Sequence, residues 1–128
     1  MEFNIKEGMS SINEIYVTEN DTASRLGSGD LDVFATPSMI ALMENTSKNV
    51  VEASLPEGYS TVGIEVSVKH IKATPLGMKV KCQAVLEKVD GKKLTFKVEA
   101  WDEKGKIGEG SHERFIINVE SFMNKIKA

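Results

Sequence analysis

The sequence predicts an α+β fold in which one long helix lies on a curved antiparallel β-sheet. One stretch, 36–54, has apolar residues at helical spacing, and four later stretches alternate between apolar and polar residues. Turn signals separate those four stretches, and consecutive strands joined by short turns favour an antiparallel meander. A lone apolar helix then needs a sheet against which to bury its apolar side. With 128 residues, the chain has the size of one domain, 1–128.

The segment before the helix is predicted to be a strand followed by a loop. The strand ends in INEIYV, residues 12–17, and the polar, glycine-containing segment NDTASRLGSGDLDV covers 20–33. Clusters of Asp, Asn, Ser and Gly are typical of turns. We therefore expect a few turns or one short helix between the strand and the long helix.

The long helix is predicted to begin at Thr36, with Thr36 as its cap and Pro37 in the first helical position. The residues that recur at helical spacing are Met39, Leu42, Met43, Thr46 and Val50. Glu44 lies at the flank of this apolar stripe. Because it is costly to desolvate an unpaired carboxylate, Glu44 either faces solvent or faces a site.

The four alternating stretches predict four strands. The first, 60–73, would place Val62, Ile64, Val66, Val68 and His70 on the face toward the helix. A tight turn in ATPLGMK leads to the strand 79–89, the Asp90-Gly91 pair predicts a hairpin to the strand 93–101, and a second turn leads to the strand 107–119. The remaining tail, ESFMNKIKA, predicts a frayed helical end.

Composition argues against several classes of protein. The formal net charge is −3 with scattered lysines, which disfavours nucleic-acid binding. No apolar run has the length of a membrane span, and the first residues do not resemble a signal peptide, so a cytoplasmic location is expected. Metal-ligand spacing, a phosphate-binding loop and a nucleophile-elbow serine are absent from the sequence. The single cysteine, Cys82, alternates with apolar positions and is expected to be buried and structural.

Two histidines are candidates for chemistry. His70 is expected to point inward, either as a hydrogen-bonded core residue or as part of a site, whereas His112 is expected to be solvated or at an interface. Together with Thr36 and Glu44, His70 could support acyl transfer to water or to a nucleophile. Thr36 and Glu44 are eight residues apart, or about 12 Å along a helix, so direct contact between them would have to cross a dimer interface.

Three segments resemble the hotdog-fold thioesterases, most closely the fluoroacetyl-CoA thioesterase type. They are VFATPSMIALMEN, VGIEVSVKHIKATPLGMKV and EGSHERFIINVESFMNK. The resemblance implies a hotdog fold, a homodimer that pairs two sheets and could pair again into a dimer of dimers, and active sites at the dimer interface. It also implies a small acyl-CoA as substrate, with no cofactor and no metal.

By position, the resemblance assigns the family's catalytic threonine, glutamate and histidine to Thr36, Glu44 and His70. It assigns the glycine that leaves room for the thioester to Gly63, and the arginine near the CoA or acyl group to Arg114. Glu44 or Thr36 would then support attack on the thioester carbonyl, and His70 would stabilise or protonate the departing thiolate. The N-terminal third departs from the family pattern, so the acyl group stays open, fluorinated or not.

Two other functions fit the same fold. A non-catalytic acyl-CoA-binding or regulatory hotdog domain would keep the pocket, but it would not need Thr36, Glu44 and His70 together. A hotdog hydratase or dehydratase would pair an aspartate with a histidine near the helix, a pair that this sequence lacks. The joint presence of the three residues favours the thioesterase.

Overall fold

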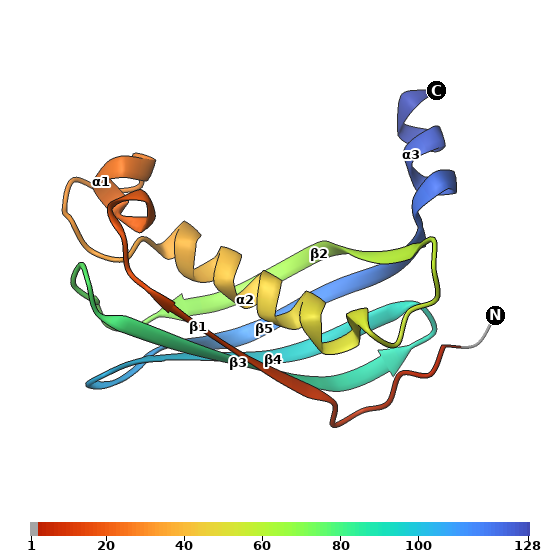
Figure 1. Ribbon diagram of the computed structural model, residues 1–128, viewed down its shortest axis with the longest axis horizontal. Helices are drawn as coiled ribbons and strands as arrows, with labels where there is room; N and C mark the ends of the chain where they lie inside the picture. The colour runs from red at the N-terminus through yellow and green to blue at the C-terminus, as the bar shows by residue number, and fades with distance from the viewer. Residues whose placement is uncertain (1–2) are drawn as a thin grey trace.

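A five-stranded antiparallel sheet with one long helix on its face forms the body of the protein (Figure 1). The computed structural model describes residues 3–128. In chain order the elements are β1 (Ser10–Tyr16), the 3-10 helix η1 (Glu19–Asp21), α1 (Ala23–Leu26), α2 (Thr36–Glu52), β2 (Tyr59–His70), β3 (Lys79–Asp90), β4 (Lys93–Asp102), β5 (Gly105–Asn118) and α3 (Val119–Lys127). The predicted α+β architecture with one long helix is confirmed.

The long helix α2 buries the predicted apolar stripe against the sheet. All five stripe residues are buried, and Ser47 and Val51 extend the contact. The prediction that Thr36 caps this helix is wrong, because the N-cap is Ala35 and Thr36 is already helical. The Thr36 side chain is therefore not used for capping and remains available to a neighbour.

The strand order is β1-β3-β4-β5-β2, so the predicted meander holds only for β3, β4 and β5. β2 pairs with β5, from Tyr59 opposite Asn118 to His70 opposite Gly108, and forms one edge of the sheet. The segment between β2 and β3 is not a hairpin turn, because its backbone bonds to earlier parts of the chain. The Phe34 amide donates to the Thr74 carbonyl at 2.9 Å, and the Gly77 amide donates to the Val17 carbonyl at 2.8 Å.

A bulge in β2 changes which side chains face the helix. The pairing register shifts between Gly63 and Glu65, which leaves Ile64 as the extra residue. Thr61 and Gly63 face the helix before the bulge, whereas Val66, Val68 and His70 do so after it. The prediction of one continuous face was therefore wrong for Val62 and Ile64 and right for His70.

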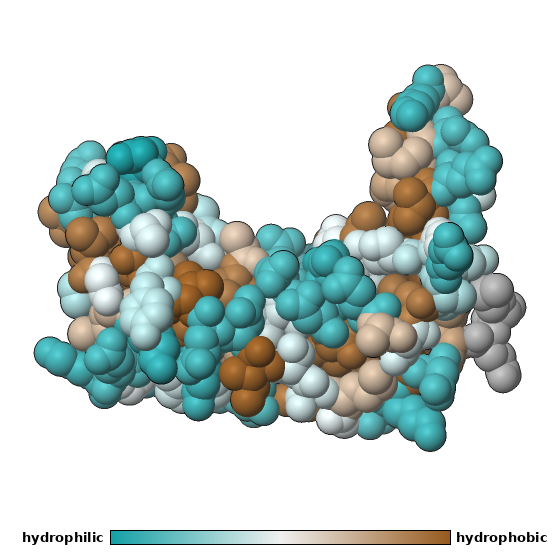
Figure 2. Space-filling model, viewed as in Figure 1, coloured by the Kyte–Doolittle hydropathy of each residue, from teal (hydrophilic) through white to brown (hydrophobic). Residues whose placement is uncertain are grey.

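Two projections rise past β2 at opposite ends of that strand. The segment with η1 and α1 lies near the end of β2, and α3 stands up near its start (Figure 1). The surface between them is hollowed (Figure 2). The tail predicted to be frayed is a helix of nine residues, and the Asn118 side chain caps it by accepting from the Ser121 amide at 3.0 Å. Across residues 3–128, no helix is long and apolar enough to span a membrane.

Candidate active site

Thr36 and His70 form a close pair where α2 begins and β2 ends. The Thr36 Oγ1 lies 2.8 Å from the His70 Nδ1. A pocket of about 310 Å³ opens beside them, and its other lining residues come from the segment before α2 and from residues 71–73. Because Thr36 sits in the first turn of a 17-residue helix, the positive end of the helix dipole faces this pocket.

Small and aromatic neighbours fix the position of His70. The Phe34 ring meets the imidazole edge to face, with centroids 6.4 Å apart. Opposite His70 on β5 stands Gly108, where any Cβ would overlap the Met39 sulfur, so glycine lets α2 approach this end of β2. The packing of α2 over Gly108 and the pairing of His70 with Gly108 therefore both help to bring Thr36 within hydrogen-bonding distance of His70.

His70 combines a lowered pKa with a ring nitrogen that has no hydrogen-bond partner in the described residues. Burial lowers its pKa from the usual 6.5, and the Lys72 backbone acts in the opposite direction. The ring is therefore neutral at pH 7. Its Nε2 atom is buried and has no hydrogen-bond partner among residues 3–128. A buried nitrogen without a hydrogen-bond partner is costly, and a catalytic role is one explanation for it.

A second cluster lies midway along β2, around Gly63. A Cβ on Gly63 would lie 3.0 Å from the Glu44 Oε2, 3.1 Å from the His112 Cε1 and 3.5 Å from the Arg114 Nη1. The missing side chain of Gly63 thus leaves a space on which a carboxylate, an imidazole and a guanidinium converge. Glu44 faces this space, so of the two alternatives for that residue the structure favours the site over open solvent.

Arg114 is held by three hydrogen bonds within this cluster. Its Nε donates to the Thr61 Oγ1 at 2.8 Å, its Nη2 donates to the Thr61 carbonyl at 2.9 Å, and its Nη1 lies 3.1 Å from the His112 Nε2. Burial lowers the pKa of Arg114, and nearby Glu44 raises it. A guanidinium has five N–H donors, so further donors remain for a ligand.

His112 is buried, with 1% of its surface exposed, so the prediction of a solvated or interface position was wrong. Its Nδ1 lies 2.8 Å from the Glu65 carbonyl, which can only accept, so Nδ1 carries the proton and Nε2 accepts from Arg114. Burial and then Arg114 lower the pKa of His112, against the Glu65 hydrogen bond and Glu44. Sequence reasoning missed this residue, although its place two positions before Arg114 on β5 was a usable signal.

The two clusters do not meet within one chain. Thr36 and Glu44 are about 12 Å apart along α2, and Gly63 and His70 are roughly 20 Å apart along β2. Both clusters nevertheless lie on the helix face of the same edge strand. A single chain therefore presents two separate clusters of polar side chains beside β2, an edge strand of the sheet.

Other candidate groups lie apart from both clusters. Cys82 is buried as predicted, and burial raises the pKa of its thiol to about 11, which makes it a poor nucleophile. Among residues 3–128, no three His, Cys, Asp or Glu side chains are grouped to hold a metal.

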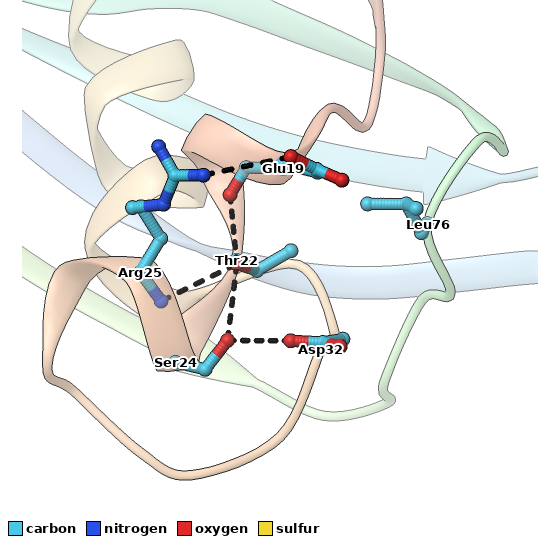
Figure 3. Close-up of a pocket in the computed structure, with 6 residues that line it drawn as sticks. All are labelled: Glu19, Thr22, Ser24, Arg25, Asp32 and Leu76. Atoms are coloured by element: carbon cyan, nitrogen blue, oxygen red, sulfur yellow. Dashed lines mark hydrogen bonds and ion pairs between the residues drawn. The ribbon is translucent and has the colours of Figure 1, made fainter.

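A larger pocket of about 430 Å³ lies on the η1 and α1 side (Figure 3). Its polar side chains bond to one another: Ser24 donates to Asp32 at 2.5 Å, and Arg25 pairs with Glu19 at 3.5 Å. These contacts already occupy the groups that line it. The pocket beside Thr36 and His70 is therefore the candidate active site.

Known proteins are similar to this chain both in sequence and in fold. The family model for the fluoroacetyl-CoA-specific thioesterase, FlK, matches residues 17–120. The fluoroacetyl-CoA thioesterase of Streptantibioticus cattleyicolor is 38% identical over 96 residues, which are 75% of this chain and 69% of that protein. A solved structure of FlK matches with a TM-score of 0.91 and 31% identity, over 97% of this chain and 96% of the other.

A thioesterase-superfamily protein of Thermus thermophilus matches with a TM-score of 0.87 and 30% identity, over 96% of this chain and 93% of the other. Fold and relatives together define a hotdog-fold thioesterase. The chain belongs to the family of the fluoroacetyl-CoA-specific thioesterase. Variants of FlK itself have been solved with fluoroacetate and CoA and with acetyl-CoA.

Proposed function

We propose that this protein hydrolyses a small acyl-CoA thioester to the free acid and CoA, at two sites in a homodimer. In each site Thr36 and His70 of one copy work with Glu44 of the other. The observation that carries this proposal is the 2.8 Å contact between the Thr36 hydroxyl and an imidazole whose other nitrogen is unpartnered, in a thioesterase family.

Pairing of two β2 edges would join the two clusters as half-sites of one active site. In a two-fold dimer, equivalent edge strands run antiparallel. Pairing centred on Ser67 would set Val66 of one copy opposite Val68 of the other. Because Ile64 is the extra residue of the bulge, Gly63 would then lie opposite His70. Residues directly opposite each other in an antiparallel pair point to the same face, and both of these face the helices. Glu44 would then reach toward the second copy's Thr36 and His70.

The chemistry would begin at the Thr36 hydroxyl. A neutral His70 that carries its proton on Nε2 can accept the Thr36 proton at Nδ1. Thr36 then either attacks the thioester carbonyl or holds the water that does so. The start of α2 would stabilise the developing oxyanion, because its dipole points a positive end at the pocket.

Departure of CoA would complete the acyl transfer. The protonated His70 would return its proton to the thiolate as the carbon–sulfur bond breaks. If Thr36 is the nucleophile, Glu44 would activate the water that cleaves the acyl-threonine ester. The net reaction consumes one water and releases one acid and one thiol, and Arg114 would bind CoA or the acyl group with its remaining donors.

The acyl group would be selected by the wall of the pocket beside Thr36. Ala23, Ser28 and Val33 belong to the segment between β1 and α2 and line this pocket. That segment lies in the N-terminal third, which we expected from the sequence to depart from the family pattern, although the family model matches from residue 17 onward. We therefore propose a short acyl chain as the substrate class and leave the presence of fluorine to the assay.

The test is release of free thiol from a panel of short acyl-CoAs, including acetyl-CoA and fluoroacetyl-CoA. Parent, Glu44→Ala and His70→Ala chains are compared, with Glu57→Ala as an exposed control. We expect turnover by the parent and the control and its loss in the two site variants. Binding of acyl-CoA without thiol release by the parent would instead support a non-catalytic acyl-CoA-binding domain.

A further inference from the structure

The C-terminal helix α3 carries an apolar stripe that its own chain leaves uncovered. The stripe residues recur at helical spacing: Val119, Phe122, Met123 and Ile126. Ile126 is 62% exposed, and Val119 and Met123 are also exposed. The main contacts of α3 within the chain are with β5, from which it emerges. Apolar side chains line the side of α3 toward the hollow (Figure 2).

The opposite projection also exposes apolar side chains. Leu26 and Leu31 flank the short helix α1, and Leu31 is 68% exposed. Ile71, directly after His70, is 53% exposed and lines the pocket beside Thr36. Isolated bridges, Thr22 with Phe34 and Val33 with Pro75, hold this projection together. It is therefore an ordered surface at the mouth of the candidate active site.

Two-fold pairing of β2, as in the proposed function on which this inference rests, brings the two projections together. α3 emerges beside the start of β2, since Tyr59 pairs with Asn118 and the Val119 amide donates to the Gly58 carbonyl at 2.9 Å. In an antiparallel pair, the start of one β2 lies beside the end of the other. In that arrangement, α3 of one copy would reach the η1 and α1 projection of its partner, because these two projections lie at opposite ends of β2 in each chain (Figure 1).

Charge complements this contact. The last turn of α3 carries Lys125 and Lys127. The projection that it would meet carries four carboxylates against one arginine, Arg25; they belong to Glu19, Asp21, Asp30 and Asp32. Opposite charges across an interface favour encounter and fix its orientation.

We infer that the apolar stripe of α3 packs on the η1 and α1 projection and on Ile71 of a second copy of this chain. Each α3 thereby forms the outer wall of the pocket beside the other copy's Thr36 and His70. The interface is isologous, because each copy gives one helix and receives one. The occupant of the stripe is a second copy, and the C-terminal helix contributes to acyl-CoA selection in trans.

Cysteine pairing tests this contact directly. Chains with Ile126→Cys are mixed with differently tagged chains carrying Ile71→Cys, oxidised and run without reductant. We expect a covalent species that contains both chains. Asn124→Cys, on the polar face of α3, is the matched control and should not cross-link to Ile71→Cys. The parent chain is the blank, since its only cysteine is buried.

Kinetics provide the second measurement. Replacing Met123 and Ile126 by glutamate should lower kcat/KM for the short acyl-CoA about tenfold, because two apolar side chains lose their cover. Asn124→Glu should stay within about twofold of the parent, since a polar surface change of this kind has little effect. A loss of kcat/KM in the variant with glutamate at Met123 and Ile126, but not in Asn124→Glu, would support the contact with the partner's pocket.

The outcomes separate this inference from the proposed function. A dimeric, active protein whose Ile126→Cys and Ile71→Cys chains do not cross-link would overturn the role of α3 alone. A monomeric protein would overturn both the role of α3 and the shared site. Cross-linking in a protein that hydrolyses no acyl-CoA would support the interface and overturn the proposed hydrolysis.

Discussion

At the end of β2, Thr36 and His70 share one short contact and leave an imidazole nitrogen unpartnered. Beside the middle of β2, by contrast, Arg114 and His112 of β5 are firmly held by hydrogen bonds. The first cluster opens on a pocket and can move a proton. The second fixes a guanidinium and a neutral imidazole around the space above Gly63. In the proposed dimer, the first cluster would perform the chemistry and the second would position a carboxylate and a cation for it.

The largest expected effect is at the reactive half-site. Thr36→Ala or His70→Ala should lower kcat about 10²- to 10⁴-fold, the range for a lost general base or nucleophile. Stopped-flow thiol detection measures the loss, and circular dichroism checks the fold. Thr36→Ser should retain more activity than Thr36→Ala, because it keeps a hydroxyl near Nδ1. Equal activity of the two variants would contradict the role of the hydroxyl.

A smaller effect is expected at the second half-site from Gly63→Ala. The new Cβ would lie 3.0 Å from the Glu44 Oε2 and 3.1 Å from His112, so the carboxylate must shift. We expect kcat/KM to fall about tenfold, in keeping with an overpacking cost of about 1 to 3 kcal/mol. Glu57→Ala, at an exposed position just before β2, is the control. An unchanged kcat/KM for Gly63→Ala would show that Glu44 needs no fixed position.

His112 should matter for stability before it matters for catalysis. His112→Asn shortens the side chain and leaves the Glu65 carbonyl and the Arg114 Nη1 without their partner. The free energy of unfolding should fall by about 1 to 3 kcal/mol, the cost of unmet buried hydrogen bonds. Denaturant titration measures it, with Ser111→Ala on the neighbouring position as control. A loss no larger than that of the control would remove His112 from the rigid cluster.

The smallest effect concerns pH. Burial lowers the pKa of both His70 and His112 from 6.5, so the neutral ring is favoured at pH 7 in the folded chain. A depressed pKa gives stability that is fully present above pH 6.5 and is lost as pH falls through the folded value. Activity should therefore stay level from pH 7 to 8 and decline only below about 6.5. In His112→Asn, the decline of stability at low pH should be shallower than in the parent.

Local signals explain what could be predicted. The apolar stripe of α2, the Asp90-Gly91 hairpin and the inward direction of His70 depend on spacing within a few residues. The strand that pairs with β2 could not be predicted, because an alternating pattern indicates which face a side chain lies on and not which strand lies beside it. The bulge at Ile64 changes which side chains of β2 face the helix. Position 64 is neither a glycine nor a proline, so the residue itself gave no signal of the bulge.

The candidate site was predicted in part for the same reason. The close pair of Thr36 and His70 depends on Thr36 being helical instead of capping, a shift of one residue that sequence patterns do not resolve. The burial of His112 depends on which side of β5 the helix covers. The convergence of Glu44 and Arg114 over Gly63 is a tertiary contact, which only the packing of α2 on β2 and β5 determines.

The most direct test of the shared site is complementation between inactive chains. Thr36→Ala and Glu44→Ala chains, unfolded and refolded together, should recover about a quarter of the parent's thiol release, since half of the dimers are mixed and each mixed dimer has one intact site. Thr36→Ala mixed with His70→Ala should recover none, because both lesions lie in the same half-site. No recovery by the first mixture, with mixed dimers present by mass, would contradict a site shared between two copies.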